Sequence, residues 1–277
     1  MKKILSLVLA AVMLAGMMSA LASCDTSTAP ARRTLTVGVT QFQPMNFLDA
    51  DGNWTGFDTE FALAVAEKLN MDVQFQQISW SQKFLELQSG AIDVIWNGMT
   101  ANAIDSTTQR PRFEDVDFTY SYMLNHQAVV VRADMADELY ANGLEGRTGS
   151  AEMGSPGESL AREAAGSGEF IGVPSQIDTF VEVMSGAVDF AVVDSILAYR
   201  MTGSGDFAAL TVAYINIGSK QEVYAIGLPI GSPLVAQFNT AIMELWGDGT
   251  LLEIAAKYGL EDLLVVNTQP IRTMPQE

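Results

Sequence analysis

The chain has very few of the residues that catalyse reactions or hold metals. Its 277 residues include one cysteine, Cys24, and one histidine, His126, which precedes an apolar run where a structural role is favoured. A single cysteine excludes an intramolecular disulfide, and no ligand spacing typical of a metal site occurs. The sequence also lacks a phosphate-binding glycine loop and a nucleophile elbow. We therefore expect a binding protein without cofactor or metal, not an enzyme.

Positive charge is scarce as well. The sequence has 15 lysines and arginines against 33 aspartates and glutamates, a formal net charge of −18. Nucleic acid and anionic membrane surfaces are poor partners for such an acidic protein. An anionic group on a ligand would therefore have to be met by a locally placed arginine.

The longest apolar stretch lies at the N-terminus. Lys2 and Lys3 precede the apolar residues 4–18, and Leu21-Ala22-Ser23 leads to Cys24. This pattern is typical of an export signal, and it is too short for a stable spanning helix. Leu-Ala-Ser-Cys resembles the lipobox of bacterial lipoproteins, in which the cysteine is lipidated. We predict a signal peptide over 1–23, then lipidated Cys24 and a flexible tether rich in Ser, Thr, Ala and Pro over 24–33.

A short phrase occurs twice in the chain. Ser89–Asp93 and Ser185–Asp189 share the pattern Ser-Gly-Ala-Ile/Val-Asp, and each leads through an apolar run to polar residues, Asn97–Thr100 and Asp194–Ser195. A small-residue turn before an apolar run predicts a helix that leads into a buried parallel strand. Open α/β sheets bind ligands at the carboxyl ends of such strands. The repeat indicates two α/β lobes with a cleft between them, although two ordinary helix-to-strand connections would give the same pattern.

Other segments have the hydrophobic periods of strands and helices. Strands are predicted over residues 35–39, 73–78, 128–131 and 223–228, and helices over 60–69, 82–88, 196–201, 234–246 and 250–258. Ser155 and Glu158 form a capping box with Pro156 at the first helical position, which predicts a further helix start. The polar segment 101–115 is predicted to be a loop.

The chain is predicted to cross between the lobes twice, near 128 and near 224. The first lobe is then discontinuous, over 34–127 and 225–277, and the second lobe, over 128–224, is inserted within it.

A few residues near these strand ends could bind a small zwitterion. Asp194 follows four apolar residues, where an unpaired buried carboxylate is costly, so we expect it to have a cationic partner. Arg110 and Arg112 are the arginines on the first-lobe side of the expected cleft, where either would be solvated and could hold a carboxylate by two hydrogen bonds. Phe42, Trp80 and Tyr120 offer aromatic walls, although for each one alone a place in the core is favoured.

Several separated motifs, in this order, resemble the bacterial extracellular solute-binding proteins of family 3, the polar amino-acid receptors of ABC importers. They are Pro44–Phe47, Gly56–Asp58, Leu87–Gly90, Ile92–Val94, Asn97–Thr100, Val116–Phe118, Val192–Asp194 and Asp248–Thr250. The similarity extends from about Thr34 to Tyr258. It implies an α/β, two-lobed periplasmic-binding-protein fold of type II, with a ligand cleft between the lobes and a two-strand hinge. It also implies a monomer with two kinds of partner, an amino-acid ligand and ABC permease subunits.

The resemblance also implies which residues contact the ligand. Phe42 and Trp80 match the aromatic positions that enclose the ligand side chain, and Asp194 matches the carboxylate that receives the α-ammonium group. Further matches lie at the first-lobe strand end and at the second-lobe helix start, namely Asn97, Gly98, Thr100 and Ser155.

The arginine that holds the ligand α-carboxylate is harder to place. Counted from Thr100, its position is Asp105 in this chain, whereas counting back from Val116–Phe118 places Arg112 there. Arg112 is therefore preferred, which implies an inserted segment ahead of it, and Arg110 stays an alternative.

Two departures bear on the ligand. Pro156 stands where the family often has a hydroxyl residue with an N–H group, which weakens the anion site. Receptors for lysine, arginine and histidine carry an aspartate just ahead of the aromatic residue, where this chain has Thr40-Gln41. This difference favours a neutral polar amino acid.

The leading hypothesis is a lipid-anchored receptor at the outer face of the cytoplasmic membrane. It would capture an amino acid by closing its lobes and deliver it to an ABC permease. Two alternatives remain open. Some proteins of this fold dehydrate cyclohexadienyl acids, which would require a general acid beside the leaving hydroxyl. The chain could also be an extracellular sensory or adhesive module.

Overall fold

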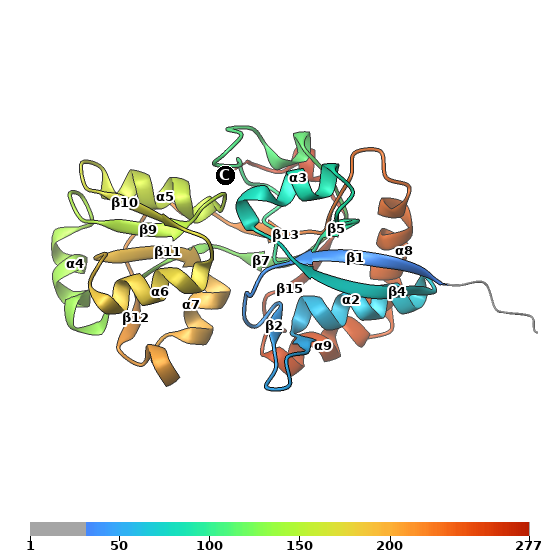
Figure 1. Cartoon of the computed structure of the whole chain (residues 1–277), viewed down its shortest axis with the longest axis horizontal. Coiled ribbons are helices and arrows are strands. Elements are labelled where there is room, and N and C mark those ends of the chain that lie inside the picture. The colour runs from blue at the N-terminus through green and yellow to red at the C-terminus, as the bar shows by residue number, and fades with distance from the viewer. Residues whose placement is uncertain (1–31, 277) are drawn as a thin grey trace, which may run out of the picture. The chain divides into compact units, whose positions relative to one another are not determined.

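Two five-stranded sheets carry the fold (Figure 1). The computed structural model describes residues 32–276, so the predicted signal peptide and Cys24 lie outside the described residues.

The first sheet has the strand order β4-β1-β5-β14-β6. Its strands are β1 (Arg33–Val39), β4 (Met71–Gln77), β5 (Val94–Ile95), β6 (Asp117–Phe118) and β14 (Gly227–Leu228). Strand β1 pairs in parallel with β4 and β5, whereas β14 runs antiparallel to β5 and β6. Three mutually packed helices belong to its core, α2 (Phe57–Lys68), α8 (Leu234–Gly247) and α9 (Thr250–Tyr258). The short helix α3 (Lys83–Gln88) contributes Leu87 to a separate apolar cluster beside β5.

The second sheet has the strand order β10-β9-β11-β8-β12. Its strands are β8 (Gln127–Arg132), β9 (Gly149–Glu152), β10 (Phe170–Val173), β11 (Phe190–Asp194) and β12 (Leu210–Ala213). Strand β9 is parallel to β10 and β11, and β8 is antiparallel to β11 and β12. Its helices are α4 (Ala136–Asn142), α5 (Pro156–Ala165), α6 (Gln176–Ser185) and α7 (Ser195–Met201). The core residues of α4 and α5 lie in one apolar cluster and those of α6 and α7 in another.

Two adjacent strands connect the sheets. Strand β7 (Ser121–Asn125) runs through His126 into β8, and the antiparallel β13 (Glu222–Tyr224) leads on to β14. The single strand expected over 223–228 is therefore two strands in two different sheets. A third strand, β15 (Leu264–Asn267), pairs with β7, and the hairpin β2 (Phe47–Leu48) with β3 (Trp54–Thr55) completes the strands.

The repeated phrase forms the same structure in both copies. Gly90 and Gly186 end their helices with φ of 75° and 76°, a conformation that favours glycine. The carboxylate of Asp93 accepts a hydrogen bond from Thr36 N at 2.8 Å, and that of Asp189 accepts one from Thr148 N at 2.9 Å. The same aspartates return their own N–H groups to the carbonyls of Thr36 and Thr148. The phrase thus ends a helix and fixes the start of the following strand to its neighbour.

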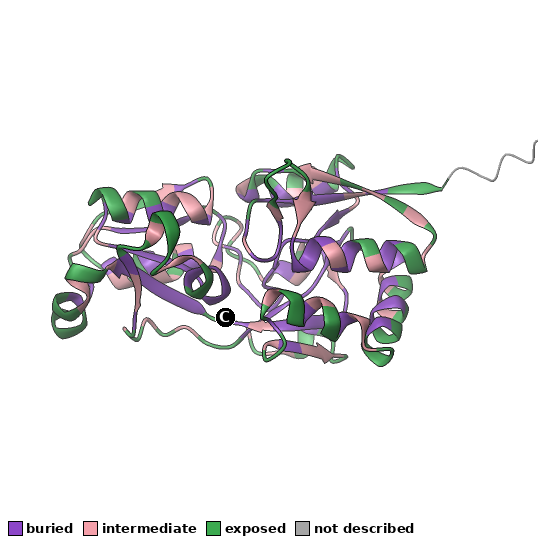
Figure 2. Cartoon of the chain, turned by 90° about the horizontal axis from the view of Figure 1, so that it is seen from below, coloured by how far each residue is buried: buried purple, intermediate pink, exposed green. Residues whose placement is uncertain are grey.

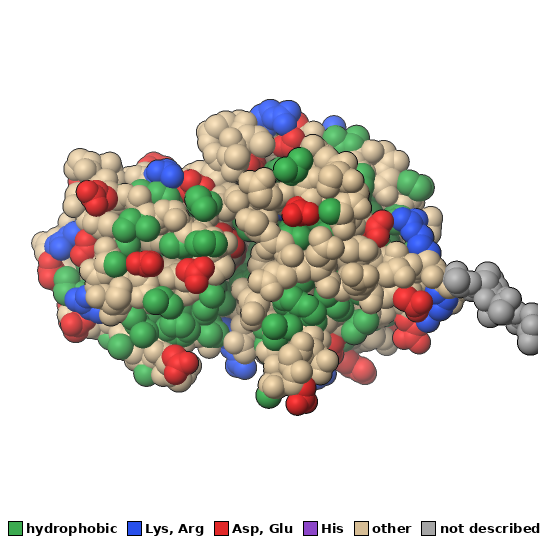
Figure 3. Space-filling view, viewed as in Figure 1, with side chains coloured by type: hydrophobic (Ala, Val, Ile, Leu, Met, Phe, Trp, Pro, Cys, Tyr) green, Lys and Arg blue, Asp and Glu red, His purple; other side chains and the backbone are tan. Residues whose placement is uncertain are grey.

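Burial follows the strands and the inner faces of the helices (Figure 2). In α2, Phe57, Phe61 and Val65 are fully buried, as expected for an amphipathic helix. Leu63, which the predicted apolar face included, is exposed, because it lies on the opposite side of the helix from Phe61 and Val65. Acidic and basic side chains are interspersed on the face shown in Figure 3. Over residues 32–276, no helix combines the length and apolar character needed to cross a bilayer.

Candidate functional site

A small cavity is lined by the carboxyl ends of β5 and β11 and by residues near them. Its volume is about 10 Å³. Seven of the eight predicted ligand contacts line it, together with three residues that were not predicted as contacts, of which only Pro156 was considered in the sequence analysis. The predicted ones are Trp80, Asn97, Gly98, Thr100, Arg112, Ser155 and Asp194, and the others are Glu152, Pro156 and Gln176.

Phe42 is the one predicted contact that does not line this cavity. Its ring is buried against Tyr224, with ring centroids 6.3 Å apart, and it packs directly over Gly98. A Cβ atom on Gly98 would lie 2.4 Å from the Phe42 ring, and Gly98 has a φ of 56°. Phe42 therefore supports the turn after β5 from behind and requires a glycine there.

Asp194 ends β11, and its carboxylate is buried. The amide groups of Asn125, Gln127 and Gln176 donate hydrogen bonds to it, that of Gln127 at 3.0 Å. Burial raises the pKa of Asp194. Three amides thus stand where we expected a cationic partner, and they satisfy the carboxylate oxygens without neutralising the charge.

Glu222 is a second buried acid, and it shares these amide donors. It accepts hydrogen bonds from Asn125 at 2.6 Å, from Gln127 at 3.0 Å and from the Thr100 hydroxyl at 3.1 Å. Burial, and next the charge of Asp194, raise the pKa of Glu222 to about 8. Glu222 could not be identified from the sequence, because it is a single acid at the start of β13, outside any motif.

Arg112 forms the positive side of the cavity. It is fully buried at the start of a 3₁₀ turn and is not the solvated loop residue that we expected. Its Nη1 donates to Thr100 O at 3.0 Å and its Nη2 to Gly154 O at 2.8 Å. Arg110, in contrast, is exposed and pairs with Asp115 and Glu114. Of the two arginines, only Arg112 lines the cavity.

The segment 101–111 folds back on itself and places Asp105 beside Arg112. The Oδ2 atom of Asp105 lies 2.7 Å from Lys83 Nζ and 3.5 Å from Arg112 Nε. Burial alone would raise the pKa of Asp105, but the charges of Arg112 and Lys83 lower it overall. Burial also lowers the pKa of Lys83 to about 8. This cluster was not predicted.

Several polar groups of the cavity wall are already used for structure. Asn97 exchanges two hydrogen bonds with Thr40, at 2.8 and 2.6 Å, and Gly98 N donates to the buried Asp58 at 2.6 Å. The Ser155 hydroxyl caps α5 by accepting from Glu158 N at 3.3 Å, as the capping box predicts. Glu158 itself accepts from Gly154 N at 2.8 Å instead of from the cap residue.

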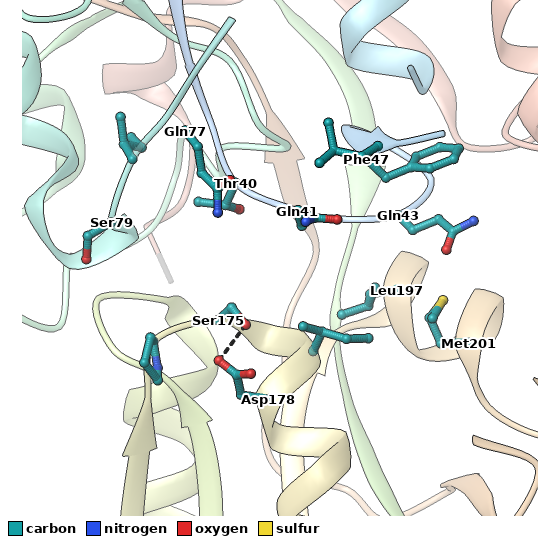
Figure 4. A pocket seen from close by; sticks show the side chains of 14 residues that line it. Thr40, Gln41, Gln43, Phe47, Gln77, Ser79, Ser175, Asp178, Leu197 and Met201 are labelled. Carbon is teal, nitrogen blue, oxygen red and sulfur yellow. Dashed lines mark hydrogen bonds between the residues drawn. The ribbon is translucent and has the colours of Figure 1, made fainter. Parts of the chain in front are cut away.

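A larger, open cavity of about 730 Å³ adjoins the small one. Figure 4 shows Thr40, Gln41 and Gln43 on one side of it and Ser175, Asp178, Leu197 and Met201 on the other. Thr40 hydrogen-bonds to Asn97 of the small cavity, and Ser175 directly precedes Gln176. Asp178 is the charged residue of its lining and accepts from Ser175 Oγ at 2.7 Å.

Two α/β lobes joined by two strands, with a polar cavity between strand ends, define a binding protein of the periplasmic type. The chain belongs to the bacterial extracellular solute-binding proteins, family 3, whose family model matches residues 35–261. The predicted α/β, two-lobed type II fold with a two-strand hinge is confirmed. Curated relatives in this family are amino-acid-binding proteins of ABC transporters.

Three similar proteins illustrate the relationship. The L-cystine-binding protein TcyA of Bacillus subtilis is 27% identical over 231 residues, which are 83% of this chain and 82% of that protein. The solved structure of an ancestral arginine-binding protein bound to arginine is 30% identical, with a TM-score of 0.70, over 82% of this chain and 98% of that one. An ABC uptake transporter substrate-binding protein from Streptococcus pneumoniae with bound histidine is 30% identical, with a TM-score of 0.72, over 84% and 94% of the two chains.

Proposed function

We propose that this protein is a membrane-anchored receptor that binds an α-amino acid between its lobes and delivers it to ABC permease subunits. The observation that carries the proposal is the placement of Asp194 and Arg112 in the wall of one buried cavity. A buried acid and a buried arginine across a small cavity suit the two charged ends of an amino-acid zwitterion. The relatives described as bound to arginine and histidine support this class of ligand.

The two ends of the ligand would be held differently. Arg112 gives one hydrogen bond from each terminal nitrogen to a protein carbonyl, and its Nε has no hydrogen-bond partner. Its remaining N–H groups are available for an α-carboxylate. The amide groups that donate to Asp194 are neutral, so an α-ammonium group could serve as its counter-ion. We propose further contacts from Trp80, Asn97, Gly98, Thr100 and Ser155, and from Phe42 behind Gly98.

Lobe closure is part of the proposal. We take residues 34–127 and 225–277 as the first lobe and 128–224 as the second, because the strands over 33–118 and 227–228 form one sheet and those over 127–213 the other. Ligand atoms that contact both Arg112 and Asp194 would draw the lobes together about β7 and β13. A monomer suffices, because one chain supplies both poles of the cavity.

The anchor is proposed from the sequence alone. The stretch Leu21–Cys24 after an apolar run suggests removal of residues 1–23 and lipidation of Cys24, which would hold the protein at the outer face of the cytoplasmic membrane. Cys24→Ala should release the protein from membranes or leave it unprocessed. Wild-type protein that is wholly soluble and carries no lipid would contradict the anchor without affecting the binding proposal.

Arg112 and Asp194 would bind the two charged ends of the amino acid, but they do not determine which side chain it carries. Thr40 and Gln41, which replace the aspartate of receptors for basic amino acids, line the larger cavity beside Gln43 and Gln77. Taken alone, these neutral groups of the larger cavity support a neutral polar ligand. The small cavity, however, contains the acid Glu152, which the sequence did not indicate and which could pair with a cationic side chain.

Calorimetric titration of the purified protein with the twenty common amino acids tests the proposal. Asp194→Ala and Arg112→Ala should each weaken binding by roughly 30-fold to several-thousand-fold, the equivalent of about 2–5 kcal/mol, because one charged end of the ligand is then buried without a partner. Arg110→Ala is the control and should bind normally, because Arg110 points away from the cavity. Full binding by both cavity variants, or no binding of any amino acid, would refute the proposal.

A further inference from the structure

Glu152 is a buried acid in the cavity wall with no hydrogen bond to its Oε1 atom. It ends β9, lines the small cavity and is 3% exposed. Asp194 and Glu222 are just as buried, but amide donors satisfy their carboxylates. A buried carboxylate that lacks such donors is unfavourable unless a cation pairs with it. The Gln176 amide also interacts with Glu152, but the Oε1 atom has no hydrogen-bond partner. Glu152 therefore differs from Asp194 and Glu222 in having one buried carboxylate oxygen left for a ligand cation.

The cations nearest to Glu152 are already engaged. Lys83 and Arg112 act on it electrostatically, but neither forms an ion pair with it among the described residues. Both pair with Asp105, and both donate to the carbonyl oxygen of Gly154. Residues 32–276 thus supply no counter-ion to Glu152 at contact distance.

An amino-acid zwitterion does not supply one either. Its carboxylate is matched by Arg112 and its ammonium by Asp194, so that Glu152 still faces the cavity unpaired. An acidic ligand side chain would add a like charge and is disfavoured. A cationic side chain would provide the missing partner.

We propose that Glu152 determines ligand specificity by binding a cationic group on the ligand side chain, so that the ligand is an amino acid with a basic side chain. This inference rests on the proposed function and names the substrate class of the same site. The long side chain of such an amino acid has room, because the small cavity adjoins the larger one through Gln176 and Ser175.

The test compares ligands that have the same shape but different charge. L-citrulline has the length of L-arginine, but its side chain ends in a neutral urea group. Calorimetry on the wild-type protein should give tighter binding of at least one of L-arginine, L-lysine and L-histidine than of L-citrulline and L-glutamine. For L-arginine against L-citrulline we expect a preference of about 30-fold or more, as for a buried charge pair that loses one partner.

Glu152→Gln is the decisive variant, because it removes the charge and keeps the size. It should abolish the preference for L-arginine while L-citrulline binds about as before. At pH 7.5 the variant should melt at or above the wild-type temperature, because folding no longer requires this carboxyl group to be either protonated or buried with its charge. The same exchange at an exposed acid, Glu163→Gln on α5, should leave the preference intact.

Three results would overturn the inference. If neutral amino acids bind the wild-type protein as tightly as basic ones, Glu152 does not select charge, although the proposed function stands. If Asp178→Asn removes the preference and Glu152→Gln keeps it, the charge is recognised in the larger cavity instead. If no amino acid binds at all, the proposed function fails and this inference fails with it.

Discussion

The Lys83 ammonium group lies 2.7 Å from the Asp105 carboxylate, and neither side chain is more than 1% exposed. Arg112 approaches the same carboxylate oxygen to 3.5 Å. Both cations also donate to Gly154 O, Lys83 at 3.1 Å and Arg112 at 2.8 Å. Gly154 follows a strand of the second lobe, whereas Lys83 and Arg112 belong to the first. The arginine proposed to hold the ligand carboxylate is thus part of a buried contact between the lobes.

The first prediction concerns the central acid of this cluster. Asp105→Asn leaves two buried cations without their shared counter-charge and should lower the free energy of unfolding by about 3–5 kcal/mol. Lys83→Met should cost less, because Arg112 still offsets the charge of Asp105. Urea unfolding of the ligand-free proteins measures both changes.

A matched control uses an exposed ion pair. Lys68 lies 3.2 Å from Asp248 with a third of its side chain exposed, so Lys68→Met should change the stability little. If Asp105→Asn were no more destabilising than Lys68→Met, the buried cluster would not contribute to stability as inferred.

The repeated strand ends could be predicted because their signals are local. The repeated phrase contains a serine, a glycine in the left-handed region and an aspartate that hydrogen-bonds to the neighbouring strand segment. These residues are close together in the sequence, so the phrase alone predicts the end of a helix and the start of a strand. Asp194 was predictable for the same reason, since it directly follows a buried strand.

Two groups of buried residues could not be predicted in this way: the cluster of Lys83, Asp105 and Arg112, and the acids Glu152 and Glu222. Lys83 begins a short helix and Asp105 lies in a polar segment, positions where charged residues are normally solvated. They become buried only because the segment 101–111 folds against the turn after β9, a contact between distant parts of the chain. Glu152 and Glu222 likewise become neighbours of Asp194 only in the folded protein.

The second prediction separates binding from stability at Arg112. Because this side chain is buried and bonded to two carbonyls, Arg112→Ala should destabilise the ligand-free protein as well as abolish amino-acid binding. Arg112→Lys keeps the charge but loses the fork of donors, so it should bind poorly and remain more stable than the alanine variant. Thermal unfolding and calorimetry on the same samples distinguish the two effects. If Arg112→Ala were as stable as the wild type, Arg112 would be a solvated residue at an open cleft, as the sequence predicted.

The third prediction concerns pH. Burial raises the pKa of Asp58 to about 7 and the pKa values of Glu152 and Glu222 to about 8, from ordinary values near 4. Between about pH 5 and 7.5 the folded protein therefore binds more protons than the unfolded chain, and its stability should fall as pH rises. Lys83, whose pKa is lowered to about 8, stays mostly protonated over this range.

Urea unfolding at pH 5.5 and 7.5 without ligand tests this expectation. Around Glu152 the charged neighbours are Asp194, Lys83 and Arg112, and Asp194 has the stronger effect on its pKa. Glu152→Gln should reduce the pH dependence, because one of the three titrating acids is removed. Stability that stays constant or rises over this interval would show that these acids are ionised in the folded protein.

The last prediction compares how much the two copies of the repeated phrase contribute to stability. Asp93 and Asp189 each hold a backbone N–H of a neighbouring strand, in the first and the second sheet respectively. Asp93→Ala and Asp189→Ala should each lower the free energy of unfolding by about 1.5–3 kcal/mol, the range for hydrogen bonds to charged groups. The exposed ion pair of Asp93 with Arg33 should add little to the first value. Because the two sites lie in different sheets and share no partner, the double variant should show the sum within about 0.5 kcal/mol. If only one variant is destabilised, the two copies of the phrase are alike in sequence but do not contribute equally to stability.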